Sequence, residues 1–317
     1  MAAYSDYRLR LRLLSPLGTP MQSDMLFGHL AWQAAWRGGD EGVAAFLKPF
    51  LAGEPPFVLS DAFPAGLLPR PQFSEPPSVS AAQDRREFAA SKRRLKAPFV
   101  SADDFVRLLA GPADIAPMDS PWVFVETLHA RIDRSTDTTT PGGQLFATQA
   151  QSLADGYDGV DVYVRALDGW RERIMDMFAE LSRTGFGRDK SAGSGAFEVV
   201  SMDTFPCFSA LNDANGFVSL STYMPKADDP TEGRWRLRVK RGYLGEMAGD
   251  GNPWKRTMIQ LEPGAVFQTG GAPKPWYGRM VRDIAPGMPR DEEHGKPGAV
   301  QCGLTLAVPC RWTGRGG

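Results

Sequence analysis

Polar and apolar residues alternate over residues 7–14, and this period of two predicts a half-buried β-strand near the start of the chain. A break rich in Pro and Gly follows, and then apolar residues recur every three or four positions, which predicts a helix. Ser23 is the expected N-cap of this helix, and the Gly38-Gly39 pair is its expected end. A second helix is expected after Asp168. Further strands are expected at residues 57–60, 122–128, 159–166 and 196–202.

The order of these elements indicates the fold class. Two β-α-β units, separated by an elaborated insertion at about 61–157, predict a split ferredoxin-like, RRM-like arrangement in which two helices cover one face of an antiparallel sheet. After about residue 202 the pattern is almost purely strand and turn, so we place a domain boundary near residue 205. We expect an α+β protein with an N-terminal domain over 1–205 and a β-rich C-terminal domain over 206–317. Strands of the second domain are expected at 217–223, 234–241, 256–261, 265–269 and 300–308.

Composition and charge narrow the class of protein. The chain has 317 residues, of which 42% are hydrophobic and 23% charged, and this is ordinary globular composition with material for about two domains. No apolar stretch approaches the ~18 residues of a membrane span, and the N-terminus lacks a signal core, so we expect a cytoplasmic protein with no membrane partner. Three cysteines without CxxC spacing indicate neither a disulfide framework nor a zinc site. The net charge of −1 excludes a uniformly basic protein but not a local nucleic-acid site.

The glycine-rich segment at 184–196 is the most informative stretch for chemistry. Glycine lets a backbone approach a ligand closely and expose its amides, and the Arg and Lys between the glycines supply positive charge for phosphate. The segment follows a helix and precedes a strand, and its spacing fits neither a dinucleotide-binding turn nor a Walker loop. A flexible connection that binds nothing is the alternative interpretation. The candidate phosphate-binding residues are Gly185, Gly187, Arg188, Lys190, Ser191, Gly193, Ser194 and Gly195.

Two further segments are basic. If residues 234–241 form a strand, Arg234, Arg236, Arg238 and Lys240 share one face while the residues between them share the other. Such a face suits a polyanionic backbone, and a solvated outer face of a sheet is an equally good interpretation. Residues 85–96 are also rich in Arg and Lys, and there a solvated loop is the favoured interpretation.

Candidates for catalysis or metal binding are weak. The three histidines are far apart and lack a paired spacing such as HExxH, and His29 lies beside the apolar face of the first predicted helix. There is no GxSxG elbow and no papain-type cysteine signature. Asp24, Asp61 and Asp133 would form a metal cluster only if folding brought them together. We therefore expect no cofactor and no catalytic set.

Several segments together resemble those of CRISPR RAMP proteins. More narrowly, they resemble the type III-A Csm effector subunit that caps the 5′ handle of the guide RNA (crRNA). Residues 14–32 are similar to the strand-to-helix signature of that subunit, and residues 60–71 to its next landmark. Residues 131–136 with 143–146 resemble a protruding thumb, and the glycine-rich segment resembles the RNA loop of RAMP proteins. The resemblance spans nearly the whole chain.

This resemblance implies tandem ferredoxin-like (RRM-like) RAMP modules, with a long insertion or thumb in the first module and a β-rich second module. It also implies a non-catalytic subunit of an antiviral complex. That subunit grips the crRNA 5′ handle, docks to the large polymerase-like Csm subunit and to the backbone RAMP subunit, and meets target RNA only indirectly. Besides the glycine-rich segment, the residues expected to contact splayed RNA nucleotides are Ser23, Asp24, His29, Arg131 and Arg134.

Two alternatives remain. RAMP relatives that process guide RNA use a histidine, so the chain is alternatively an endoribonuclease in which His29 acts as general acid or base, although no companion base is evident. The other alternative is a protein-interaction module in which the basic strand is merely solvated.

Overall fold

The computed structural model describes most of the chain. The described residues are 3–73, 97–111, 113, 115–116, 118–130, 132–133, 135–136, 138–139, 145–208, 211, 213–244, 252, 254–286, 291 and 298–312. The basic segment 85–96 and the residues Arg131, Arg134 and His294 lie outside them. Within the described ranges, no helix is both long and apolar enough to cross a membrane.

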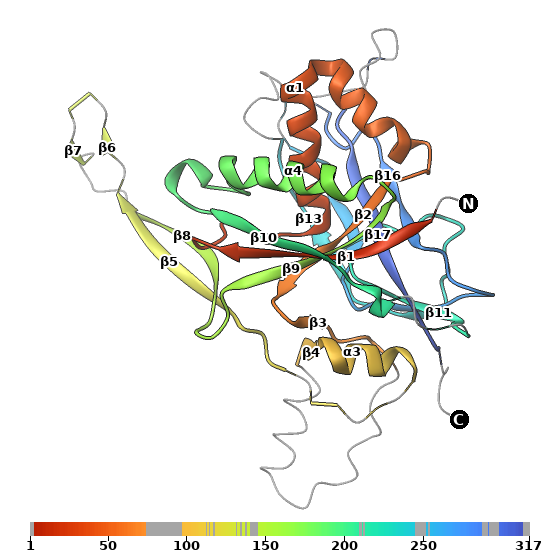
Figure 1. Cartoon of the computed structure of the whole chain (residues 1–317). Helices are drawn as coiled ribbons and strands as arrows, with labels where there is room; N and C mark the ends of the chain where they lie inside the picture. Colours follow the sequence, from red (N-terminus) through yellow and green to blue (C-terminus); the bar gives the residue numbers. More distant parts are fainter. Residues whose placement is uncertain are drawn as a thin grey trace, which may run out of the picture.

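The N-terminal half is built around a four-stranded antiparallel sheet (Figure 1). This sheet has the strand order that a split β-α-β-β-α-β connection produces, so the arrangement predicted for these strands is present. In spatial order its strands are β10 (Phe197–Thr204), β1 (Tyr4–Leu13), β9 (Gly159–Leu167) and β2 (Phe57–Pro64).

Two helices, α1 (Ser23–Leu51) and α4 (Arg171–Thr184), contact each other and lie together on one side of this sheet (Figure 1). The first helical segment ends at the glycine pair, as predicted, because helical geometry is interrupted at Gly39. Gly39 adopts φ 59° and ψ −148°, which kinks α1, and a second helical part continues beyond it. This part is retained because its apolar side chains are buried, with Phe50 packing edge-on against Phe27 at a centroid distance of 4.8 Å. The second helix also starts later than predicted, because Trp170 rather than Asp168 occupies its N-cap position.

The insertion is more regular than the sequence predicted. A long antiparallel hairpin of β5 (Trp122–Ala130) and β8 (Leu145–Leu153) projects away from the rest of the molecule, with two very short strands at its far end (Figure 1). The strand expected at 122–128 within the insertion is confirmed, and it belongs to a longer hairpin. The other elements of the insertion are β3 (Leu67–Pro69), β4 (Phe99–Ser101), α3 (Ala102–Leu109), β6 (Ile132–Asp133) and β7 (Thr138–Thr139).

The C-terminal part forms a second antiparallel sheet and a separate two-stranded pair. The pair consists of β13 (Leu237–Lys240) and β14 (Met258–Leu261). Among the described residues after 205, the one helical element is the 3₁₀ turn η2 (Pro206–Phe208), so a second ferredoxin-like module stays a prediction. In spatial order the sheet contains β12 (Gly233–Arg234), β15 (Val266–Gln268), β11 (Gly216–Ser219), β17 (Gln301–Cys310) and β16 (Trp276–Val281).

The two halves share one hydrophobic core. A single buried cluster contains Leu9 of β1 and Leu306 of β17, and β17 contacts α1, β2 and β9 directly. A buried ion pair lies at the same junction. Arg165 binds Asp6 at 2.6 Å within the first half, and its guanidinium also donates across the junction to the carbonyl of Ala307 at 2.6 Å. The boundary near residue 205 stays a prediction, and the core shows that packing is continuous across it.

Candidate nucleic-acid interface

The glycine-rich loop connects α4 to β10 and contains the short 3₁₀ turn η1 (Lys190–Ala192). Its glycines are required by backbone conformation, since Gly185, Gly187, Gly193 and Gly195 all have φ between 73° and 90°. Gly195 is the most constrained of them, because a Cβ atom there would lie 1.9 Å from the carbonyl oxygen of Phe186. The loop therefore has a specific shape that other residue types would disturb, and this argues against a merely flexible connection.

Residues far away in the sequence hold this loop in place. The Gly187 amide donates to Nε2 of His29 at 3.1 Å, and the Arg188 amide donates to Oγ1 of Thr19 at 3.2 Å. The amide of Gly195 donates to the carbonyl of Pro16 at 2.8 Å. The loop thus packs on the segment after β1 and on the first turns of α1.

Burial, together with the smaller effect of the nearby charge of Lys190, lowers the pKa of His29 to about 4. At neutral pH the ring is therefore uncharged, which leaves Nε2 free to accept the Gly187 amide. His29 also contacts the ring of Phe186 at a centroid distance of 4.8 Å. The structure gives His29 the role of positioning the glycine-rich loop.

Most backbone amides of the loop are used inside the protein. Besides those of Gly187, Arg188 and Gly195, the amides of residues 185, 186 and 192–194 donate to main-chain carbonyls. Amides that already donate within the fold are not available to phosphate oxygens. The expectation that the backbone of this loop forms a phosphate cradle is therefore not supported for these residues.

The charged side chains of the loop point outward. Arg188, Lys190 and Ser191 are exposed, and Ser194 is half-buried. The guanidinium of Arg188 binds Asp189 at 2.9 Å and the main-chain carbonyl of Gln149 on β8 at 2.9 Å. The ammonium of Lys190 lies 5.7 Å from the ring centroid of the exposed Trp36. The exposed cation of Lys190, on the loop that also carries Arg188, thus lies beside the exposed Trp36 of α1. The charge of Arg188 is paired with Asp189, and cations beside aromatic rings are a combination that binds nucleic-acid strands.

The β5–β8 hairpin adjoins this loop. Its root is bonded to the segment after β1, because Leu17 and Gln151 exchange two main-chain hydrogen bonds of 2.7 and 2.8 Å. Beyond the root, both strands of the hairpin expose large apolar side chains, because two strands alone bury little surface. Arg131 and Arg134, which we expected to contact RNA here, lie outside the described residues. The exposed apolar residues are Val123, Phe124, Val125, Leu128, Leu145 and Phe146.

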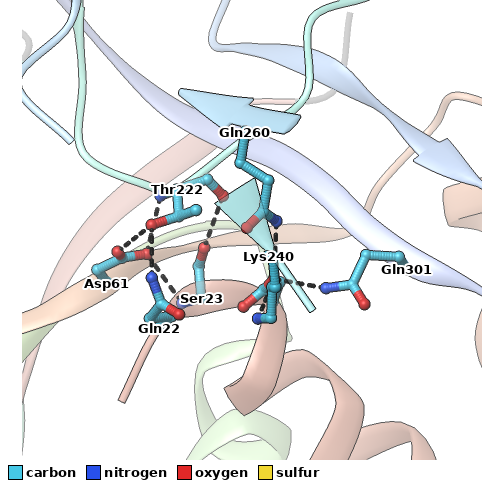
Figure 2. Close-up of polar contacts among 8 residues, drawn as sticks. Gln22, Ser23, Asp61, Thr222, Lys240, Gln260 and Gln301 are labelled. Atoms are coloured by element: carbon cyan, nitrogen blue, oxygen red, sulfur yellow. Dashed lines mark hydrogen bonds and ion pairs between the residues drawn. The ribbon is translucent and has the colours of Figure 1, made fainter. Parts of the chain in front are cut away.

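The predicted RNA ligands Ser23 and Asp24 are buried instead of lying on the surface. The Ser23 amide donates to Asp61 at 2.9 Å, and the Ser23 hydroxyl donates to the carbonyl of Thr222 at 3.3 Å (Figure 2). Burial raises the pKa of Asp61, although hydrogen bonds from Ser23 and Thr222 oppose this rise. Ser23 therefore joins the start of α1 to the second half of the chain.

Oδ2 of Asp24 is surrounded by donors from the second half of the chain. It accepts from Nζ of Lys240 at 2.6 Å, from Nε2 of Gln260 at 2.9 Å and from Nε2 of Gln301 at 2.5 Å. Figure 2 shows Lys240, Gln260 and Gln301 converging beside the start of α1. With these contacts Asp24 is a structural residue, and we do not retain Ser23 or Asp24 in the RNA-binding surface.

Of the three aspartates considered from the sequence as a metal cluster, the structure describes the side chains of two, so that hypothesis stays untested. Asp24 and Asp61 lie along the same buried seam, and the side chain of Asp133 is outside the described residues. Within the described part of the chain, no group of three or more His, Cys, Asp or Glu side chains is placed to hold a metal ion.

The basic segment 234–241 is not a single strand, and its charge is not uniformly turned outward. Leu237 and Val239 on β13 are 62% and 61% exposed, whereas Arg238 and Lys240 are half-buried. This reverses what a solvated basic face would show. The physical reason is that the inward face of β13 meets the carboxylate of Asp24, so Lys240 is drawn inward.

Comparison with solved structures finds chains of similar fold. A chain of the Csm1-Csm4 cassette in complex with cA4 matches with a TM-score of 0.62 and 18% identity, covering 98% of this chain and 100% of that one. A chain of the Csm3-Csm4 subcomplex in the type III-A CRISPR-Cas interference complex matches with a TM-score of 0.54 and 14% identity, covering 96% and 99%. Csm4 is the subunit that both assemblies have in common. This chain shares the Csm4 fold.

The likeness to Csm4 extends over almost the full length of both chains, so the projecting hairpin and both sheets belong to the comparison. No protein-family model matches the sequence, and no curated protein matches it either. The shared fold agrees with the RAMP resemblance drawn from the sequence motifs.

Proposed function

We propose that this protein is a non-catalytic guide-RNA-binding subunit of a type III-A CRISPR effector complex, which holds the 5′ handle of the crRNA. The observation that carries the proposal is the position of the glycine-rich loop at the root of the β5–β8 hairpin, with Arg188 and Lys190 exposed. Single-stranded RNA is bound by positive groups along its backbone and by apolar or aromatic surfaces against its bases. The loop supplies the first and the hairpin the second.

In this proposal the parts of the interface have separate roles. Arg188 and Lys190 pair with handle phosphates, and His29 and Thr19 position the loop that carries them. The exposed hairpin residues, such as Phe124 and Phe146, contact bases where the handle meets the spacer. The protein docks to the polymerase-like subunit and to the backbone RAMP subunit, as in the assemblies that contain its structural neighbours, and meets target RNA through them.

The alternative of a guide-processing endoribonuclease receives no support from His29. A general acid or base works best when its pKa lies near the operating pH, and the pKa of His29 is lowered to about 4. Its Nε2 atom is also occupied by the Gly187 amide. We therefore keep the non-catalytic proposal.

The proposal is tested by purifying the chain with its native nucleic acid and by measuring binding of a labelled single-stranded RNA across a salt titration. In the variant Arg188→Ala with Lys190→Ala we expect weaker binding and a salt slope that is smaller by about 1.4, since each phosphate contact on single strands contributes about 0.7. The matched control is Arg107→Ala with Lys226→Ala, which removes the same charges from exposed positions away from the loop. Equal slopes in both variants would reject the loop as the RNA site.

A further inference from the structure

A large groove lies between the two halves of the chain, and residues at the root of the β5–β8 hairpin contribute to its lining. Its volume is about 1620 Å³, which exceeds the ~300–1,000 Å³ of a pocket for a small molecule. Its lining includes the segment after β3, the segment from β12 to β13, and Trp122 and Gln151 at the root of the hairpin. The size suits a chain-like ligand.

Arginine side chains gather in this groove. Arg70 comes from the segment after β3, and Arg234, Arg236 and Arg238 come from the segment from β12 to β13. Burial lowers the pKa of Arg70, and the charge of Arg236 acts in the same direction, so these two guanidiniums repel each other. No described carboxylate lies within ion-pair distance of Arg234, Arg236 or Arg238, although Glu232 and Glu262 also line the groove. A polyanion would relieve this repulsion.

The walls of the groove are held together by the fold. Gln72 donates its amide to the carbonyl of Gly264 at 2.9 Å, in the turn between β14 and β15. Gly264 has φ +87°, and a Cβ atom there would lie 2.7 Å from the carbonyl oxygen of Arg70. Arg70 is therefore fixed opposite the arginines of the second half by close backbone contact, so the groove is a built feature.

Aromatic side chains are interleaved with these charges, and their presence favours a nucleic-acid strand over an acidic peptide as the ligand. Trp235 is 40% exposed and stacks with one face on Phe267 at a centroid distance of 5.3 Å. Trp122, Phe73 and Phe99 also line the groove and are half-buried. An acidic peptide would use the arginines alone, whereas a nucleic-acid strand uses arginines for phosphates and aromatic faces for bases.

We propose that this groove is a second binding site for single-stranded RNA, in which the arginines pair with phosphates and Trp235 stacks on a base. The inference rests on the proposed function. The hairpin root connects the two sites, because Gln149 of β8 contacts Arg188 of the loop while Gln151 lines the groove. One RNA strand thus runs from the glycine-rich loop past the hairpin root and into the groove.

The test measures binding of a labelled oligouridylate to the full chain across a salt titration. Arg234→Ala with Arg236→Ala is expected to reduce the salt slope by about 1.4, from two phosphate contacts of about 0.7 each. Trp235→Ala is expected to weaken binding by about 5- to 150-fold with the salt slope unchanged, while Trp235→Phe retains most of the affinity. The matched control is Arg279→Ala with Arg282→Ala, two exposed arginines of the same half that do not line the groove; its slope is expected to equal that of the wild type.

The outcomes separate this inference from the proposed function. If the groove variants bind as the wild type does while Arg188→Ala with Lys190→Ala weakens binding, the groove inference is overturned and the proposed function stands. If the wild-type chain binds no RNA at low salt, both are overturned. If polyglutamate binds as tightly as the RNA and the groove variants lose it, the groove takes an acidic protein segment and the RNA assignment is wrong.

A measurement on the wild-type chain keeps the inference testable if a variant fails to fold. Photo-cross-linking with a thiouridine-containing strand, followed by peptide mapping, is expected to label Trp235 or Phe73 as well as the glycine-rich loop. Labelling confined to residues 185–195 and the hairpin would overturn the groove site.

Discussion

The two basic segments of this chain, the glycine-rich loop and strand β13, place their charge in opposite ways. In the loop, backbone amides donate inward to His29 and Thr19, and the side chains of Arg188 and Lys190 are exposed. In β13, Lys240 turns inward to Asp24 while the apolar side chains beside it are exposed. The difference lies in what each segment meets in the fold. Positive charge in a sequence therefore indicates a polyanion site only when its internal partners are known.

The largest effect on stability is expected from removing the charge of Lys240, the residue of β13 that turns inward. Lys240→Ala removes the cation that neutralises Asp24, whose side chain is 0% exposed. Removing one partner of a buried ion pair leaves an uncompensated charge, and the free energy of unfolding should fall by about 3–5 kcal/mol. The hydrogen bonds that remain on Oδ2 of Asp24 come from the uncharged amides of Gln260 and Gln301, which do not replace the lost ammonium charge. Urea denaturation measures this change.

Two further variants calibrate that measurement. Lys226→Ala removes a lysine whose ion pair with Asp228 is exposed on both sides, and its stability should stay close to that of the wild type. The double variant Asp24→Asn with Lys240→Met removes both charges and should recover much of the loss. A Lys240→Ala protein as stable as the Lys226→Ala protein would contradict the structural role of the Asp24 seam.

The outcome for β13 also shows why the sequence was informative for some elements and not for others. Alternation over 7–14 predicted β1, because its apolar residues Leu9 and Leu11 are buried while Arg8, Arg10 and Arg12 are less so. The strand at 159–166 was predicted in the same way, but in β9 the polar residues Asp161 and Arg165 are buried as well, each in an ion pair. In β13 the same alternation defines two faces but not which of them is turned inward. That choice depends on Asp24, which is 216 residues away in the sequence.

The candidate site was predictable in its composition but not in its contacts. The glycines and charges of the loop are visible in the sequence, whereas the partners of its amides come from other elements, with His29 lying 158 residues from Gly187. No local pattern marks Thr19 or Gln149 as neighbours of Arg188. Strand β16 was missed for a related reason. Gly278 interrupts its apolar pattern, and glycine is required there by a φ of +97° and by the carbonyl oxygen of Gly303, which would lie 2.0 Å from an added Cβ.

A second, smaller effect on stability is expected from a substitution at Gly195 in the glycine-rich loop. Gly195→Ala forces a Cβ atom into the carbonyl of Phe186 at a residue with φ +73°, so the loop must move. A loss of about 2–3 kcal/mol in unfolding free energy is expected, together with weaker RNA binding. Gly193→Ala is the matched control, because its φ is +90° but nothing lies within 4 Å of the added Cβ. In Gly193→Ala the free energy of unfolding should fall by only about 1 kcal/mol, the cost of backbone strain, as measured by thermal unfolding. Equal losses in the two variants would show that the close packing at Gly195 is unimportant.

The smallest expected effect concerns the pH dependence that His29 gives to the loop. The pKa of His29 is about 4 in the folded protein and about 6.5 when unfolded, so between these values the unfolded chain binds a proton that the folded chain does not. Stability is therefore lost as the pH falls below 6.5, by about 2 kcal/mol between pH 7 and pH 5. Urea denaturation at several pH values measures this slope. In His29→Gln the side-chain oxygen can still accept the Gly187 amide but cannot titrate, so this part of the slope should vanish while other groups, including Asp61, contribute equally to both proteins. If the stability of the two proteins changes with pH in the same way, His29 takes up a proton in the folded chain as readily as in the unfolded chain. Another contact than its hydrogen bond with Gly187 would then hold the loop in position.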